Sequence, residues 1–94
     1  MKESTLRTKI KKALEAEDCF VAVIHQAGYT IKGLSDLVGC LPDGQFFSLE
    51  VKIPGRERTL TPRQLHVLKT ITRHGGIAEM VTSVDDALEA LGLS

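Results

Sequence analysis

The sequence predicts a single α+β domain over residues 1–94, with the element order αβββαβα and a mixed sheet flanked by helices. Three observations predict this fold class. A chain of 94 residues can build one small hydrophobic core but not two. Hydrophobic residues make up 43% and charged residues 26%, which is typical of folded globular domains rather than disordered chains. Segments with helical spacing alternate with short apolar runs of strand length.

The predicted elements, in chain order, are a helix over 4–17, strands over 19–26, 35–41 and 46–53, a helix from Pro62 to the Gly75-Gly76 pair, a strand over 77–81 and a helix after Ser83. The first helix is predicted because Leu6, Ile10 and Leu14 recur at helical spacing after Ser4, a favourable N-cap residue. The run over 19–26 is apolar for most of its length, which favours a strand buried on both faces.

The second and third strands are predicted to form a hairpin. A loop over 28–33 precedes the second strand, which Gly39 interrupts. The turn signal Pro42-Asp43-Gly44 then leads into the third strand. This turn suits a three-residue loop, with Pro leading and Gly in the left-handed position.

The second half of the chain begins with a capping box. Thr61 and Gln64 form a Thr-x-x-Gln pattern with Pro62 at the first helical position. The short strand after Gly75-Gly76 and the Ser83-x-x-Asp86 pattern complete the predicted order.

Composition excludes several classes of protein. The chain has 12 basic and 12 acidic residues, so it is neither a uniformly basic nucleic-acid-coating protein nor an acidic tail protein. Its apolar runs are too short to span a bilayer, and no apolar segment follows Met1 as in a signal peptide. Cys19 and Cys40 lie in apolar runs and are predicted to be buried free thiols. We therefore expect a cytoplasmic protein with no membrane association.

The charges are balanced in total but segregated along the chain. Basic residues concentrate in 2–12 and 49–75, and acidic residues in 79–94. This segregation predicts a basic face for a polyanionic partner. The alternative is solvated helix surfaces with local charge pairing.

Two carboxylates are predicted to meet in the hairpin. The third strand alternates, with Ser48, Glu50 and Lys52 on one face, a pattern that an edge strand with a wet face would also show. Asp36 lies in an otherwise apolar stretch and needs a metal, a cation or water. A three-residue loop places Asp36 directly opposite Glu50, whereas a two-residue loop would place it opposite Val51 on the wrong face.

This arrangement predicts a metal site. Two close carboxylates, with a lysine nearby and Glu3 at the inward edge of the first helix, suit Mg²⁺ or Mn²⁺. Such a cation polarises a phosphoryl oxygen and acidifies bound water. Lys52 would orient that water or neutralise charge on the phosphate. Gln64, at the inward edge of its helix, would reach the scissile phosphate or a metal-bound water.

The ordered set Gly33-Leu34-Ser35-Asp36, Glu50-Val51-Lys52 and Gln64 resembles the PD-(D/E)XK nuclease pattern. Within that superfamily the chain is similar to the VRR-NUC family, particularly its short stand-alone phage and bacterial forms. The resemblance implies a restriction-endonuclease-like core in which Asp36, Glu50 and the Val51 carbonyl ligate the metal, Lys52 is catalytic and Glu3 completes the acidic cluster. Ser35 departs from the family, because many members carry proline there. The resemblance also implies homodimers that act on branched DNA such as Holliday junctions.

The remaining candidates concern DNA contact and zinc. Arg56 and Arg58, beside the predicted site, and Arg63 on the following helix suit contact with DNA phosphates, although a solvated loop is the alternative. His25, His66 and His74 do not have the spacing of a zinc site.

The sequence therefore predicts a metal-dependent DNA endonuclease that hydrolyses phosphodiester bonds. The alternatives are a catalytically weak nucleic-acid-binding module on the same fold and a non-catalytic interaction domain.

Overall fold

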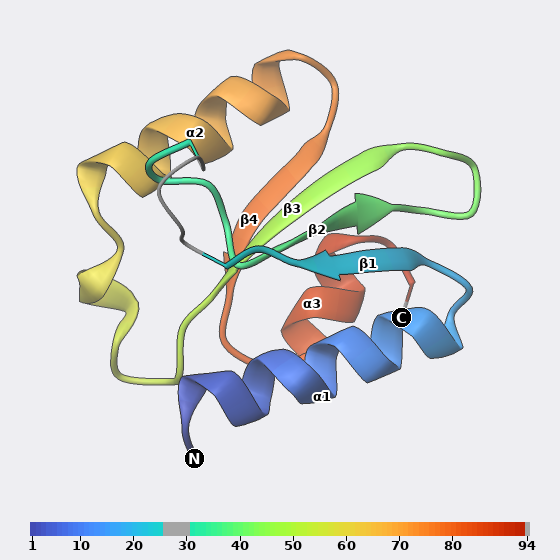
Figure 1. Ribbon diagram of the computed structural model, residues 1–94, viewed down its shortest axis with the longest axis horizontal. Helices are drawn as coiled ribbons and strands as arrows, with labels where there is room; N and C mark the ends of the chain where they lie inside the picture. The colour runs from blue at the N-terminus through green and yellow to red at the C-terminus, as the bar shows by residue number, and fades with distance from the viewer. Residues whose placement is uncertain (26–30, 94) are drawn as a thin grey trace.

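The computed structural model describes residues 1–25 and 31–93, and these form a four-stranded sheet with helices on both faces (Figure 1). The elements are α1 (Glu3–Ala16), β1 (Phe20–Val23), β2 (Leu37–Cys40), β3 (Phe46–Val51), the 3₁₀ turn η1 (Glu57–Thr59), α2 (Pro62–Arg73), β4 (Ile77–Val81) and α3 (Val84–Ala90). The predicted order αβββαβα is confirmed, with η1 as an addition.

The sheet is mixed, as predicted, and its strands lie in the order β1-β2-β3-β4. The first three strands pair antiparallel, and β4 pairs parallel to β3 after α2 has crossed over the sheet. The hydrophobic core lies between one face of the sheet and the helices α1 and α3, and it includes Ile10, Leu14, Phe47, Val81 and Ala87. Because α2 contributes no residue to that core, it covers the opposite face, where it packs against β3 and β4.

Two predictions about the N-terminal elements are wrong. The first helix begins at Glu3, and its N-cap is Lys2 rather than Ser4. The first strand spans only Phe20–Val23 and is not buried on both faces, since Phe20 is 67% exposed. The physical reason is its position: β1 is an edge strand, and α2 packs on β3 and β4 instead. The last residue of the predicted strand and the first half of the predicted 28–33 loop lie outside the described residues.

The hairpin between β2 and β3 has the predicted register. Leu37 pairs with Leu49 and Cys40 pairs with Phe46. The Leu41 amide donates to the Gln45 carbonyl at 2.9 Å, which closes a three-residue loop. The strands are shorter than predicted, but the alignment on which the two-carboxylate prediction depends is confirmed.

The atoms around Gly39 leave no room for a side chain. A Cβ at this position would lie 1.9 Å from the Phe20 carbonyl oxygen and 2.8 Å from Cζ of Phe47. Gly39→Ala should therefore destabilise the protein by about 3 kcal/mol or more in urea unfolding, because the backbone of β1 and a core aromatic ring must both move.

The matched control is Gly44→Ala, where no atom lies within 4 Å of the added Cβ. Gly44 has a φ of +92°, so alanine there adds only backbone strain of about 1–2 kcal/mol. Equal losses in the two variants would contradict the packing explanation.

Both cysteines are free, with Cys19 buried and Cys40 half-buried. Burial raises the pKa of the Cys19 thiol, helped by the charges of Asp18 and Glu17. No helix within residues 1–25 and 31–93 is long and apolar enough to cross a membrane.

Candidate active site

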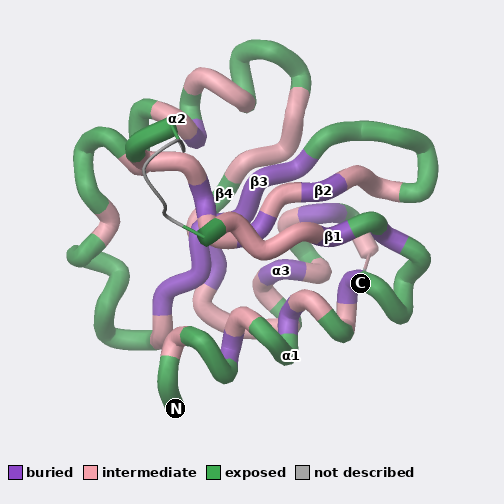
Figure 2. Tube along the Cα trace, in the orientation of Figure 1, coloured by how far each residue is buried: buried purple, intermediate pink, exposed green. Residues whose placement is uncertain are grey.

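The end of β3 carries two charged side chains into the interior. This strand lies between β2 and β4 and is buried along residues 47–51 (Figure 2). Glu50 is 2% exposed and Lys52 is 7% exposed, so the wet face of an edge strand is excluded. Because buried charges are costly unless they are paired or have a task, this strand end is the candidate site.

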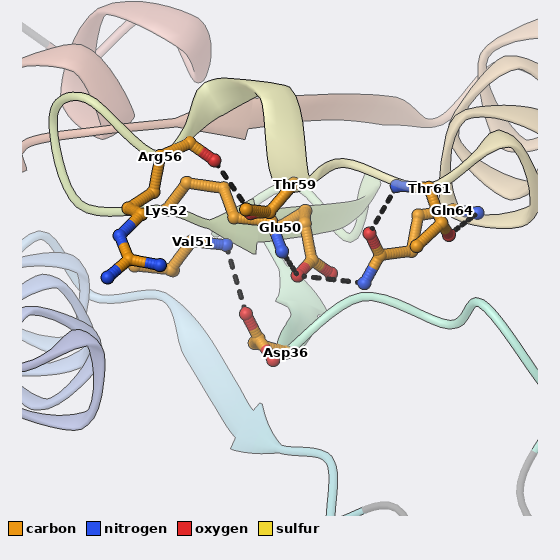
Figure 3. Close-up of polar contacts among 8 residues, drawn as sticks. All are labelled: Asp36, Glu50, Val51, Lys52, Arg56, Thr59, Thr61 and Gln64. Atoms are coloured by element: carbon orange, nitrogen blue, oxygen red, sulfur yellow. Dashed lines mark hydrogen bonds and ion pairs between the residues drawn. The ribbon is translucent and has the colours of Figure 1, made fainter.

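Asp36 approaches the same place from β2. It lies one residue before Leu37, the first residue of that strand. Its Oδ2 accepts a hydrogen bond from the Val51 amide at 3.1 Å (Figure 3). A side-chain carboxylate thus binds the backbone of β3 just beyond the last paired residues, Leu37 and Leu49. This contact anchors Asp36 beside Glu50.

The two carboxylate oxygens of Glu50 differ in their hydrogen bonding. Its Oε2 lies 3.6 Å from Nζ of Lys52 and accepts a 3.3 Å hydrogen bond from Nε2 of Gln64. Its Oε1 is buried and has no hydrogen-bond partner in the structure. One oxygen is therefore held by two donors, and the other is buried without a donor.

The surroundings raise the pKa of Glu50 to about 8. Burial is the largest cause, and the charge of Asp36 and a hydrogen bond shared with its carboxyl group add to it. The ammonium of Lys52 acts in the opposite direction, while the charge of Glu3 in the first turn of α1 raises the pKa further. The protein alone therefore stabilises the Glu50 carboxylate poorly, as expected for a site that is completed by a cation.

Gln64 is placed by the start of α2. Its backbone amide donates to Oγ1 of Thr61 at 3.1 Å, and its Oε1 accepts from the Thr61 amide at 2.9 Å. The predicted capping box is therefore present. The bond from Gln64 to Glu50 was not predicted, because it depends on how α2 packs across the sheet. The Thr-x-x-Gln pattern was the available signal.

The arginines lie outside this buried group. Arg56 and Arg58 are in the exposed segment between β3 and α2, and Arg63 is exposed in the first turn of α2. In Figure 3 the Arg56 side chain points back toward the end of β3. The segment is ordered by η1 and by a 2.6 Å hydrogen bond from Oγ1 of Thr59 to the Arg56 carbonyl.

The predicted acidic cluster of three carboxylates is not assembled. Within the described ranges, no group of three or more His, Cys, Asp and Glu side chains is placed to hold a metal ion. Glu3 affects Glu50 through its charge, but it belongs to the separate helix α1. The described part of the chain likewise offers no zinc site.

A hard divalent cation nevertheless fits the remaining donors. Magnesium is commonly held by one or two carboxylates together with water and substrate phosphate. Asp36 and Glu50 offer two carboxylates, and the Val51 carbonyl is a further candidate donor. Two observations favour a cation at this position: Oε1 of Glu50 has no hydrogen-bond partner, and the pKa of Glu50 is raised.

Comparison with known proteins gives matches among solved structures. A structure described as a VRR_NUC domain has a TM-score of 0.76 at 23% identity, covering 96% of this chain and 94% of that chain. A second, described as a VRR_NUC domain protein, has a TM-score of 0.77 at 16% identity, covering 98% of this chain and 86% of that chain. No protein-family model and no curated protein matches.

The fold and the site together define an α+β domain with a buried acid–lysine pair at the end of its third strand. The solved structures it resembles identify this fold as that of VRR_NUC domains. The resemblance predicted from the sequence is thus confirmed at the level of the fold.

Proposed function

We propose that this chain is a metal-dependent endodeoxyribonuclease of the VRR-NUC family, which hydrolyses phosphodiester bonds in DNA. The observation that carries the proposal is the buried meeting of Asp36, Glu50 and Lys52 in a domain with the VRR_NUC fold. One fold supports many functions, so this group of side chains is what favours nuclease activity.

The cofactor we propose is Mg²⁺ or Mn²⁺. Asp36, Glu50 and the Val51 carbonyl would hold it, and Glu3 would add negative charge from α1. When bound, such a cation supplies polarisation of the scissile phosphate and acidifies nearby water. Its positive charge would also offset the desolvation that raises the pKa of Glu50.

The protein's own groups then have distinct tasks. The Lys52 ammonium, 3.6 Å from Glu50, would orient the attacking water and neutralise charge that develops on the phosphate. Gln64 would hold Glu50 in place through its 3.3 Å hydrogen bond. The exposed Arg56, Arg58 and Arg63 would contact the DNA backbone.

The finer part of the proposal concerns substrate and assembly. We propose selectivity for branched DNA such as Holliday junctions, a homodimer, and action in the cytoplasm of a bacterial or phage-infected cell. Symmetric cutting of two strands needs two sites. Exposed Phe20 and Phe46 lie on either side of Cys40 across three strands, which supports an apolar contact between copies.

The test is cleavage of an end-labelled four-way junction with Mn²⁺, beside duplex, flap and splayed-arm substrates. Wild-type protein should cut the junction at symmetric positions. Lys52→Gln should lower the rate by about 10²-fold or more, because it removes a buried charge beside the reacting phosphate.

Lys69→Gln is the matched control, since Lys69 is exposed on α2. This variant should cleave DNA at the wild-type rate. The proposal fails if wild-type protein cuts no substrate or if Lys52→Gln cuts as fast as Lys69→Gln. Junction binding without cutting would favour the nucleic-acid-binding alternative.

A further inference from the structure

We propose that Thr61 is a positioning residue whose backbone N–H holds the Gln64 amide so that its NH₂ group faces Glu50. The inference concerns the geometry of the candidate site, and its consequence for metal binding rests on the proposed function. In Figure 3 Gln64 lies between Thr61 and Glu50, with a dashed contact to each.

The two ends of the Gln64 amide group have different hydrogen-bonding roles. Oε1 of Gln64 only accepts hydrogen bonds, and Nε2 only donates them. Because Oε1 accepts from the Thr61 amide at 2.9 Å, Nε2 is left on the other side, where it donates to Oε2 of Glu50 at 3.3 Å. A flipped amide would lose the Thr61 bond and set two oxygens against each other.

The hydrogen bond from Gln64 determines which oxygen of Glu50 is left without a donor. Nε2 of Gln64 and Nζ of Lys52 both face Oε2, while Oε1 has no partner. A fixed Gln64 therefore keeps Glu50 turned so that Oε2 faces both donors and Oε1 is the buried oxygen without a hydrogen-bond partner. Outer hydrogen bonds of this kind orient groups that bind metals.

The choice of residue agrees with this double task. Glu and Gln both complete a capping box, and a negative charge in the first turn is favoured by the helix dipole. At position 64, however, a carboxylate would face Glu50, which is buried and already near the charge of Asp36. Only the amide can both cap α2 and donate to Glu50.

The experiment separates the backbone N–H of Thr61 from its side chain. Thr61→Ala removes Oγ1 but keeps the N–H, whereas Thr61→Pro removes both. Proline fits, because Thr61 has φ −81° and ψ 158° and Leu60 before it has φ −61° and ψ 118°. The readouts are the Gln64 side-chain NH₂ signals in NMR spectra and Mn²⁺ affinity by calorimetry.

The expected result is a difference between the two variants. In Thr61→Ala the Gln64 NH₂ signals should stay where they are in the wild type, and Mn²⁺ affinity should change by less than about twofold. In Thr61→Pro the signals should move toward those of a free amide, and affinity should fall about tenfold. A variant pair with the same NH₂ signals overturns the proposal.

A measurement on the wild-type chain keeps the test decisive if Thr61→Pro does not fold. NMR coupling across the hydrogen bond, from the Thr61 amide nitrogen to the Gln64 side-chain carbonyl carbon, should be detectable, and its absence overturns the proposal. If the NMR results hold but the wild type neither binds Mn²⁺ nor cleaves DNA, the proposed function fails while the positioning by Thr61 stands.

Discussion

Asp36→Asn should abolish DNA cleavage and, at the same time, make the metal-free protein more stable at pH 8 and above. Asparagine can still accept the hydrogen bond from the Val51 amide, so the hairpin should remain intact. The negative charge beside buried Glu50 is lost, however, and that charge helps to raise the pKa of Glu50. Removing it relieves repulsion but leaves the proposed cation with one carboxylate instead of two.

We expect the cleavage rate of Asp36→Asn to fall by about 10³-fold or more, because charge at the reacting centre is usually the largest single contribution to rate. Urea unfolding in EDTA should show a rise in the free energy of unfolding of about 1 kcal/mol. The control is Asp85→Asn, since Asp85 is exposed in the first turn of α3. Full activity in Asp36→Asn would contradict the assigned role.

The metal-free protein should lose stability as the pH rises from about 5 to about 8. In the folded protein the pKa of Glu50 is raised from 4.5 to about 8. Between these values the unfolded chain has released its proton while the folded chain keeps it, so unfolding becomes easier by up to about 1.4 kcal/mol per pH unit. Above pH 8 both states are ionised and this contribution levels off.

Urea unfolding in EDTA between pH 5 and pH 9 measures this slope. Glu50→Gln should remove it, because glutamine does not titrate and every other residue is the same in both proteins. Glu57→Gln, at the exposed first residue of η1, should keep the wild-type slope. The account is contradicted if Glu50→Gln retains the slope or if wild-type stability rises over this range.

The part of the fold that was predicted well depends on local chemistry. The Pro42-Asp43-Gly44 turn determines a loop length, and the loop length determines which residues of β2 and β3 pair. The predicted two-sided burial of β1 was wrong because it depends on strand order. Nothing in residues 19–26 indicates that β1 lies at the edge, away from α2.

The same distinction applies to the site. The sequence was enough to predict that Asp36, Glu50 and Lys52 lie close together, because they belong to one hairpin. Glu3 and Gln64 lie on helices, and the position of a helix depends on how it packs on the sheet. That packing gives Gln64 a bond to Glu50 and leaves Glu3 outside any group of three ligands among the described residues.

The most direct test of the cation site proposed between Asp36 and Glu50 is the melting temperature measured against Mn²⁺ concentration. A ligand that binds only the folded state raises the melting temperature progressively once its concentration exceeds the dissociation constant. Wild-type protein should show this rise, and Glu50→Gln should show none. An unchanged wild-type melting temperature at the Mn²⁺ concentrations that support DNA cleavage, or an equal rise in Glu50→Gln, would contradict the proposed cation site.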